Sequence, residues 1–328
     1  MAERRRVFVT RALPGAAPLA RLRDVAAVDV WEHERPPAPD EVAARSEGCA
    51  AILPMLTERI DGALLDACPT VHTVANMAVG YDNIDVPAAS ERGVLVTNTP
   101  DVLTDTTADI AFALLLAAAR RVTEGERTVR AGEWGTWHPT WMLGRDVHGA
   151  TLGIVGPGRI GRAVARRAAG FDMRVLYAGR REVPGFPGEC VSFEALLERS
   201  DFVSVHVPLT PETTRLFNAG AFRRMKPTAI FVNTARGGVV DQAALRDALV
   251  RGEIAAAALD VTTPEPLPPD DPLLDAPNLV VTPHLGSATA QTREAMASLA
   301  VDALCSAFAG KRPRHLVNPD AWTHWRGA

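Results

Sequence analysis

The chain has 328 residues, about twice the length of a ~150-residue domain, and 47% of them are hydrophobic, so two domains with sizeable cores are expected. The formal net charge of −4 argues against nucleic acid or a membrane surface as a general partner. Four scattered cysteines without a CxxC pair indicate reduced, mostly core thiols in a cytoplasmic protein. The longest apolar run, residues 110–119, is too short for a ~30 Å bilayer, and no export signal is recognisable.

The first hundred residues alternate short apolar runs with helix-like stretches. Strands are predicted at residues 5–10, at 50–54, from 71 onward and at 93–100. Such an alternation favours a parallel sheet that is covered by helices on both faces.

One long helix is predicted over residues 104–132, with Thr104 or Asp105 as its cap, and a short aromatic segment follows at 132–144. From residue 149 a second alternating series begins, and a long helix at 288–309 leads into the C-terminal tail. The series holds six strand candidates: ATLGIVG, MRVLYAG, DFVSVHVP, TAIFVNTA, IAAAALDV and NLVVTPH. Six parallel strands with a glycine-rich turn after the first of them are typical of a doubly wound dinucleotide-binding fold.

Both ends of the chain lie outside this second series, which predicts an insertion. We expect an α/β protein with a doubly wound Rossmann dinucleotide-binding domain, residues 102–287, inserted into a flavodoxin-like substrate-binding domain. The outer domain would consist of residues 1–101 and 288–328. Two crossings make a hinge, and the cleft between domains is the expected active site.

The segment GIVGPGRIG carries the glycine pattern G-x-G-x-x-G at Gly156, Gly158 and Gly161. A strand precedes it, and the helix that follows begins with Arg159 and Ile160. In this context the glycines permit a tight turn, close approach of the backbone to a pyrophosphate, and close packing of the helix on the strand. The helix N-terminus adds N–H donors and partial positive charge for the phosphates.

The end of the second strand of this series, VLYAGRRE, has Gly179 where many such proteins place an acid that binds the adenosine ribose. Arg180 and Arg181 follow, and two guanidinium groups would attract a 2′-phosphate that a carboxylate would repel. The sequence therefore predicts a preference for NADP(H) over NAD(H). In the alternative interpretation both arginines are solvated surface charges and Glu182 accepts the ribose hydroxyls.

Three polar residues follow predicted strands, where ligands gather in an open α/β sheet: Arg236 in NTARGG, Glu265 in TTPEPLP and His284 in TPHLGS. Each has a structural alternative: Arg236 could form an interdomain ion pair, Glu265 could cap a helix, and His284 could be a core histidine. Their joint placement favours a catalytic set.

At these residues the chain resembles the D-2-hydroxyacid dehydrogenase family, and within it the glyoxylate/hydroxypyruvate reductases. The similar motifs are GPGRIG, VHVPLTPETT, MKPTAIFVNTARGGVVDQAAL, AAALDVTTPEPLPPDDPLL, PHLGSAT and, near the N-terminus, NMAVGYDNIDV. The resemblance implies that Arg236 binds the substrate carboxylate and polarises the keto group. It also implies that His284 is the general acid or base, oriented by Glu265, which favours the charged imidazole.

The same resemblance extends to residues with smaller roles. Val79 and Gly80 would offer backbone N–H groups to the substrate carboxylate, Leu53, Met55 and Leu56 would form a pocket wall, and Ser287 would contact the substrate end. Trp141 resembles an aromatic that enters the partner subunit's pocket, with a dimer-core tryptophan as the equal alternative; both imply a homodimer. The remaining residues expected to face the cofactor are Thr107, Val207, Pro208, Thr213, Thr234, Ala235, Asp260 and Gly286.

The favoured function is NADPH-dependent reduction of glyoxylate or hydroxypyruvate, giving glycolate or D-glycerate. Glu265 disfavours a formate dehydrogenase, and Gly179 with no added regulatory domain disfavours a phosphoglycerate dehydrogenase. Another D-2-hydroxyacid dehydrogenase, a phosphite dehydrogenase and a non-catalytic dinucleotide-sensing binding protein remain as alternatives. No metal is expected.

Overall fold

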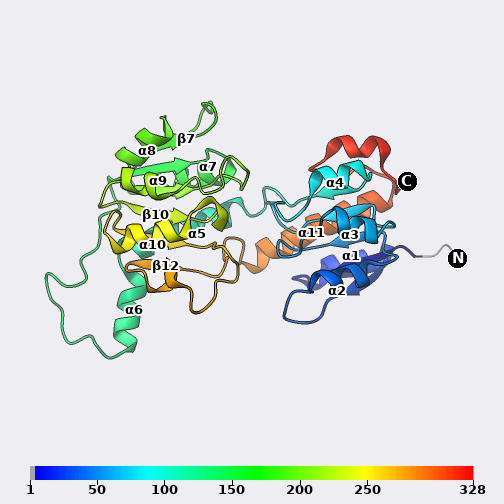
Figure 1. Cartoon of the computed structure of the whole chain (residues 1–328), viewed down its shortest axis with the longest axis horizontal. Coiled ribbons are helices and arrows are strands. Elements are labelled where there is room, and N and C mark those ends of the chain that lie inside the picture. The colour runs from blue at the N-terminus through cyan, green and yellow to red at the C-terminus, as the bar shows by residue number, and fades with distance from the viewer. Residues whose placement is uncertain (1–3, 328) are drawn as a thin grey trace. The chain divides into compact units, whose positions relative to one another are not determined.

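The computed structural model describes residues 4–327 of the chain (Figure 1). These residues form two compact units, which we call the outer unit and the inserted unit. The outer unit runs to Leu103 and resumes at Thr289, and the inserted unit is Thr104–Ala288.

The outer unit contains a sheet of five parallel strands in the order β2-β1-β3-β4-β5. The strands are β1 (Arg6–Val9), β2 (Ala27–Val30), β3 (Ala51–Leu53), β4 (Thr73–Ala75) and β5 (Leu95–Thr97). This order is the flavodoxin-like one, as the sequence predicted. The sequence interpretation missed β2, because this edge strand is half-exposed and contains no apolar run.

Helices cover both faces of this sheet. They are α1 (Ala16–Val25), α2 (Pro39–Ser46), α3 (Gly62–Ala67), α4 (Val86–Glu91), α11 (Ala290–Phe308) and the 3₁₀ segment η4 (Pro319–His324). Helix α11 is the predicted C-terminal helix; the side chain of Thr289 caps it by accepting the N–H of Thr292, 3.2 Å away. It packs against α1 and β4, and the apolar core holds fully buried side chains such as Phe8, Ile52 and Val74.

The C-terminal tail closes the edge of this sheet beside β5. Leu316 forms an antiparallel bridge with Thr97. Asn318 accepts the N–H of Val96 through Oδ1 at 2.9 Å and donates through Nδ2 to the carbonyl of Val94 at 2.9 Å. The tail is therefore an integral part of the outer unit.

The inserted unit contains seven parallel strands in the order β12-β11-β10-β9-β6-β7-β8. They are β6 (Thr151–Val155), β7 (Arg174–Ala178), β8 (Glu189–Cys190), β9 (Phe202–Val205), β10 (Ile230–Asn233), β11 (Ala256–Leu259) and β12 (Leu279–Val281). Reading outward from β6, this is the doubly wound Rossmann arrangement with one extra strand. The prediction of six strands was one too few, because β8 has two residues, both exposed, at the sheet edge.

The helices of this unit are α5 (Thr104–Ala119), α6 (Val122–Arg130), α7 (Arg159–Ala168), α8 (Phe193–Arg199), α9 (Ala219–Arg224) and α10 (Gln242–Val250). Four 3₁₀ segments complete the helical elements of the described residues, three of them here: η1 (Ala169–Phe171), η2 (Gly237–Val239) and η3 (Pro272–Asp275). The prediction of one helix over 104–132 was wrong. Arg121 adopts a left-handed backbone conformation (φ 52°) between α5 and α6, which ends one helix and begins the next.

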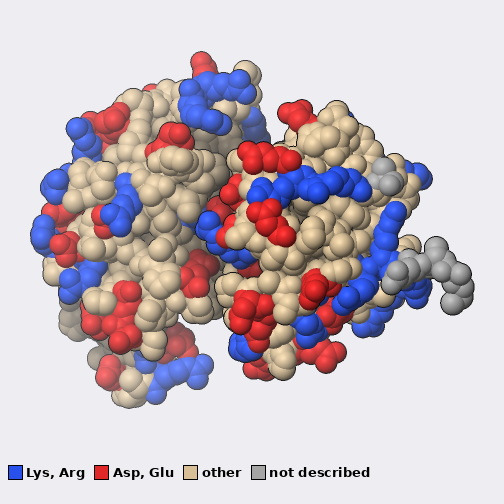
Figure 2. All heavy atoms as spheres, turned by 45° about the vertical axis from the view of Figure 1, so that its right-hand side comes forward, with Lys and Arg blue, Asp and Glu red and all other residues tan. Residues whose placement is uncertain are grey.

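Acidic and basic side chains are interspersed on the face shown in Figure 2. Ion pairs between such groups in the described residues include Arg92–Asp66 at 2.7 Å. Cys49 and Cys68 are buried, whereas Cys190 is exposed and Cys305 partly so; the expectation of mostly core cysteines therefore holds for only two of them. Between residues 4 and 327, no helix is both long enough and apolar enough to span a membrane.

Candidate active site

The glycine turn between β6 and α7 packs tightly at two positions and is open at the third. Gly156 has φ 100°, and a Cβ there would lie 2.7 Å from the backbone of His206. A Cβ at Gly161 would lie 2.4 Å from the carbonyl oxygen of Gly156, which accounts for the close contact of helix and strand. At Gly158 nothing lies within 4 Å, so the N-terminus of α7 faces open space. These residues fit a dinucleotide pyrophosphate.

The loop after β9 borders this turn. Val207 is its nearest apolar neighbour, with Cγ1 2.9 Å from a Cβ placed at Gly156. Thr213 Oγ1 donates to the carbonyl of Pro208 at 2.6 Å, which fixes the loop's shape. Burial lowers the pKa of His206 to about 3, so this imidazole is neutral at physiological pH.

The absence of a side chain at Gly179 has a packing cause. A Cβ at this position would lie 2.7 Å from Cδ of Pro157, the residue between the first two glycines of the turn. An acid could not be placed here without shifting the glycine turn. The following arginines, Arg180 and Arg181, are exposed, and neither makes a hydrogen bond or ion pair within the described part of the chain.

The charge of Arg180 acts on the neighbouring loop after β9. The pKa of Glu212 in that loop lies below its ordinary value, chiefly because of hydrogen bonds from Thr210 and from its own backbone N–H, and also because of the charge of Arg180. Since β7 and β9 flank β6, Arg180 lies beside the edge where the glycine turn opens.

The three predicted catalytic residues follow three adjacent strands, β10, β11 and β12. His284 Nδ1 lies 2.9 Å from Glu265 Oε2. The two side chains are 27% and 30% exposed, respectively. The other carboxylate oxygen of Glu265 accepts the N–H of Thr262 at 3.0 Å. The opposite imidazole nitrogen, Nε2, is left for another partner.

The carboxylate of Glu265 is held in its charged form. Burial raises its pKa, but the hydrogen bond and charge of His284, the N–H of Thr262 and the charge of Arg236 together outweigh burial, so the pKa lies below the ordinary value. Arg236 is thus close enough to act electrostatically on the pair. The structure brings the three residues together: His284 binds Glu265 directly, and the charge of Arg236 acts on the same carboxylate.

His284 stands in a left-handed backbone conformation (φ 55°), which a non-glycine residue rarely adopts. The fully buried carboxylate of Asp260, which is 1% exposed, fixes the loop around it. Its oxygens accept the N–H of Leu285 at 2.7 Å, the N–H of Gly286 at 2.8 Å and the hydroxyl of Thr282 at 2.6 Å. Asp260 was expected to face the cofactor; its support of the loop around His284 was not predicted from the sequence.

The Arg236 loop is also fixed by its neighbours. Asn233 donates to the carbonyl of Arg236 at 2.9 Å and accepts the N–H of Ala235 at 3.0 Å. A Cβ at Gly237 would lie 2.0 Å from the carbonyl oxygen of Thr262, so only glycine permits the Arg236 loop to approach the Glu265 loop this closely.

The other candidates in the inserted unit lie at or near the carboxyl edge of its sheet or on its surface. Thr107 Oγ1 donates to the carbonyl of Gly286 at 3.0 Å, and the buried hydroxyl of Thr234 has no partner among the described residues. Ser287 is partly exposed. Trp141 is 42% exposed in a long segment without helix or strand.

The outer-unit candidates lie in the loops after β3 and β4. Leu53 is the last residue of β3 and is fully buried, whereas Met55 and Leu56 are partly exposed. Val79 and Gly80 are also partly exposed. Of the predicted pocket wall, Met55 and Leu56 therefore offer the accessible side chains.

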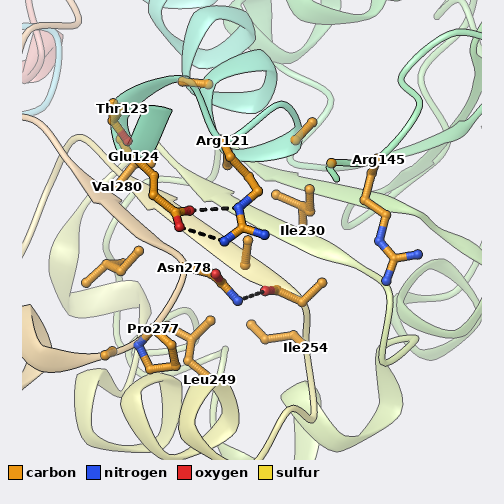
Figure 3. Close-up of a pocket in the computed structure, with 18 of the residues that line it drawn as sticks. Arg121, Thr123, Glu124, Arg145, Ile230, Leu249, Ile254, Pro277, Asn278 and Val280 are labelled. Carbon is orange, nitrogen blue, oxygen red and sulfur yellow. Dashed lines mark hydrogen bonds and ion pairs between the residues drawn. The ribbon is translucent and has the colours of Figure 1, made fainter. Parts of the chain in front are cut away.

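A cavity of about 740 Å³ lies in the inserted unit, and none of the three catalytic candidates is among its lining residues (Figure 3). Its lining includes Ile230, Ala256 and Leu279, the first residues of β10, β11 and β12, so it opens at the amino ends of the strands. Figure 3 shows the ion pair between Arg121 and Glu124, 2.6 Å apart, at this cavity.

A sequence profile described as "D-isomer specific 2-hydroxyacid dehydrogenase, NAD binding domain" matches residues 112–286, which include the glycine turn and all three catalytic candidates. The chain belongs to this dehydrogenase family. It is 52% identical over 320 residues to a glyoxylate reductase of Korarchaeum cryptofilum and 48% identical over 323 residues to one of Pyrococcus furiosus, with 96% of each chain covered in both comparisons.

Among solved structures, the dehydrogenase is similar to the NADPH-dependent glyoxylate/hydroxypyruvate reductase of Sinorhizobium meliloti, determined in complex with NADP and malonate. The sequence identity is 35%, the TM-score is 0.86, and the match covers 97% of this chain and 98% of the other. The family recognised from the sequence motifs is therefore confirmed, together with a two-domain α/β fold and an NAD(P)-binding Rossmann domain.

Proposed function

We propose that this dehydrogenase reduces glyoxylate or hydroxypyruvate with NADPH, yielding glycolate or D-glycerate. The observation that carries the proposal is the Arg236–Glu265–His284 arrangement, with the His284–Glu265 hydrogen bond of 2.9 Å at the carboxyl edge of the sheet. The names of its relatives support the substrate class.

The residues divide the reaction between them. When bound, a nicotinamide cofactor would supply the hydride for the carbonyl carbon. Arg236 binds the carboxylate of the 2-oxo acid and polarises its keto oxygen. His284 gives the proton on Nε2 to that oxygen as it becomes a hydroxyl, and Glu265 holds Nδ1 and offsets the imidazolium charge. In the outer unit, Val79, Gly80, Met55 and Leu56 are assigned to the substrate.

The preference for NADPH rests on Arg180 and Arg181. Both are exposed and free of ion pairs in the described part of the chain, and the glycine before them offers no carboxylate that would repel a 2′-phosphate. Two guanidinium groups in this position can bind a phosphate through charge-assisted hydrogen bonds.

The test is a kinetic panel of short 2-oxo acids, each with NADPH and with NADH, monitored by the loss of reduced-nicotinamide absorbance. Arg180→Ala combined with Arg181→Ala should weaken NADPH binding about 10- to 100-fold and NADH binding little. Arg223→Ala combined with Arg224→Ala is the matched control, because it removes the same charge from α9 of the same unit. Tight dinucleotide binding without turnover of any 2-oxo acid would favour a sensor instead.

We also propose a homodimer formed through the segment after α5. Six of the ten large apolar side chains that are exposed in the described residues lie between residues 122 and 143: Val122, Val129, Trp134, Trp137, Trp141 and Leu143. An exposed apolar set of this size is rare on a monomer. Leu143 also lines the cavity of Figure 3, which gives a second copy of the chain a concave surface to cover.

A further inference from the structure

The loop after β4 in the outer unit is anchored through its carbonyl oxygens. Three successive carbonyls are each bound by a donor of the same unit: Ala78 O by Thr99 N at 2.9 Å, Val79 O by Asn98 Nδ2 at 2.8 Å, and Gly80 O by Asn76 Nδ2 at 2.9 Å. Asn76 is fully buried. Two of the three anchors are thus side-chain amides.

Anchoring these carbonyls determines where the neighbouring N–H groups point. In a trans peptide the C=O and the following N–H lie in one plane and point in opposite directions. The bond from Asn98 to Val79 O therefore directs the N–H of Gly80 away from Asn98, and the bond from Asn76 to Gly80 O does the same for the N–H of Tyr81. Within residues 4–327, the N–H groups of Val79, Gly80 and Tyr81 have no protein acceptor.

A second set of bonds ties this loop to the loop after β3. Asn83 Nδ2 donates to the carbonyls of Met55 and Glu58, both at 3.0 Å, and lies 3.4 Å from Asn76 Oδ1. The carboxylate of Glu58, which is 3% exposed, accepts the N–H of Met55 at 2.8 Å and the hydroxyl of Thr10 at 2.5 Å. Both proposed substrate loops therefore share one rigid polar frame.

We propose that Asn98 and Asn76 are positioning residues that turn consecutive backbone N–H groups toward an anionic ligand. Resting on the proposed function, the ligand is the carboxylate of the 2-oxo acid. Asparagine suits this task because its amide donates to a carbonyl without adding a charge that would compete with the substrate. Without the donor, the carbonyl loses the partner that fixes it and its peptide can rotate, which takes the N–H groups out of line.

The test combines turnover with a binding measurement that needs none. In Asn98→Ala the KM for glyoxylate and for hydroxypyruvate, and the Kd for oxalate in the NADPH-bound enzyme, should each rise about tenfold. kcat should change less than about threefold, and the Kd for NADPH should stay the same, because only carboxylate binding is affected. Asn98→Asp, which has the same shape but no donor, should behave alike if the alanine variant folds poorly.

Asn318→Ala is the matched control, because it removes an amide that binds backbone in the same unit at β5. It should lower the melting temperature without changing KM. Unchanged KM and oxalate Kd in both Asn98 variants, or an equal rise in Asn318→Ala, would overturn the positioning role. A wild-type enzyme that reduces no 2-oxo acid, but whose oxalate binding weakens in the Asn98 variants, would disprove the substrate assignment and support the positioning.

Discussion

His284 donates its backbone N–H to the carbonyl oxygen of Asp260 at 3.0 Å, while the carboxylate of the same aspartate accepts the N–H groups of the two residues after His284. Asp260 thus holds the backbone of His284 in a left-handed conformation that a non-glycine residue would otherwise avoid.

Asp260→Asn should therefore impair catalysis more than cofactor binding. The amide cannot accept both N–H groups with equal strength, so the imidazole shifts, and a shift of about 1 Å can lower kcat on the order of 100-fold. kcat and the Kd for NADPH measure the two effects. Asp201→Asn is the control, because Asp201 likewise accepts a backbone N–H, that of Thr151, at the other end of the same sheet. Similar losses of kcat in both variants would contradict the role.

Glu265→Gln should shift the pH profile of reduction. Because its pKa lies below the ordinary value, Glu265 keeps its charge throughout the neutral range, so the variant removes a constant negative charge beside His284. Loss of the anion disfavours the imidazolium, so the alkaline limb of kcat/KM should move to lower pH by about one unit. The control is Glu189→Gln on β8, where the carboxylate pairs with Arg174 and Arg199 on the surface. A limb that stays in place would mean that another group titrates.

Gly179→Asp should not increase the affinity for NADH. The new Cβ would meet Pro157, so the glycine turn must shift and the affinity for both cofactors should fall by about tenfold or more. Adding Pro157→Ala should recover NADH binding, measured by fluorescence titration. Gly170→Asp, at a glycine with nothing within 4 Å of its Cβ position, should leave both affinities unchanged. Gain of NADH binding by Gly179→Asp alone would contradict the steric argument.

Trp137→Asp should weaken the proposed dimer. Trp137 is 78% exposed, and a charge there would oppose burial against a second copy. Sedimentation velocity should find a monomer, or a dimer that dissociates at micromolar concentrations. Val25→Asp, at an exposed apolar residue of the outer unit, should leave the mass unchanged. Trp141→Ala should change substrate preference or dimer stability. If it changes neither, Trp141 is not part of the substrate site or of the dimer contact.

The sequence was sufficient to predict the two-domain topology because buried parallel strands read as apolar runs between glycine-rich turns. Strands β2 and β8 were not predicted, because each lies at a sheet edge and lacks such a run. Strand β2 has four residues and β8 has two. The break at Arg121 was also not predicted, because the alanines and the arginine before it favour a helix and no proline marks the end of α5.

Arg236, Glu265 and His284 could be predicted as a candidate catalytic set because chemistry-bearing side chains follow three strands. The residues that hold the neighbouring backbone in place were not predicted. Asp260 holds N–H groups about 25 positions away, and Asn98 holds a carbonyl 19 positions away, so their roles arise only when the strands align. Asn98 lies in an Asn-Thr-Pro turn directly after β5, a pattern that by itself indicates only a turn.

The hydrogen bond between Thr107 and Gly286 joins residues 179 positions apart, at the start and the end of the inserted unit. The two ends of this Rossmann unit are therefore adjacent. A domain with adjacent ends can be expressed separately or circularly permuted with little change to its interior. A gene for residues 104–288, circularly permuted at an exposed loop, should still encode a dinucleotide-binding protein.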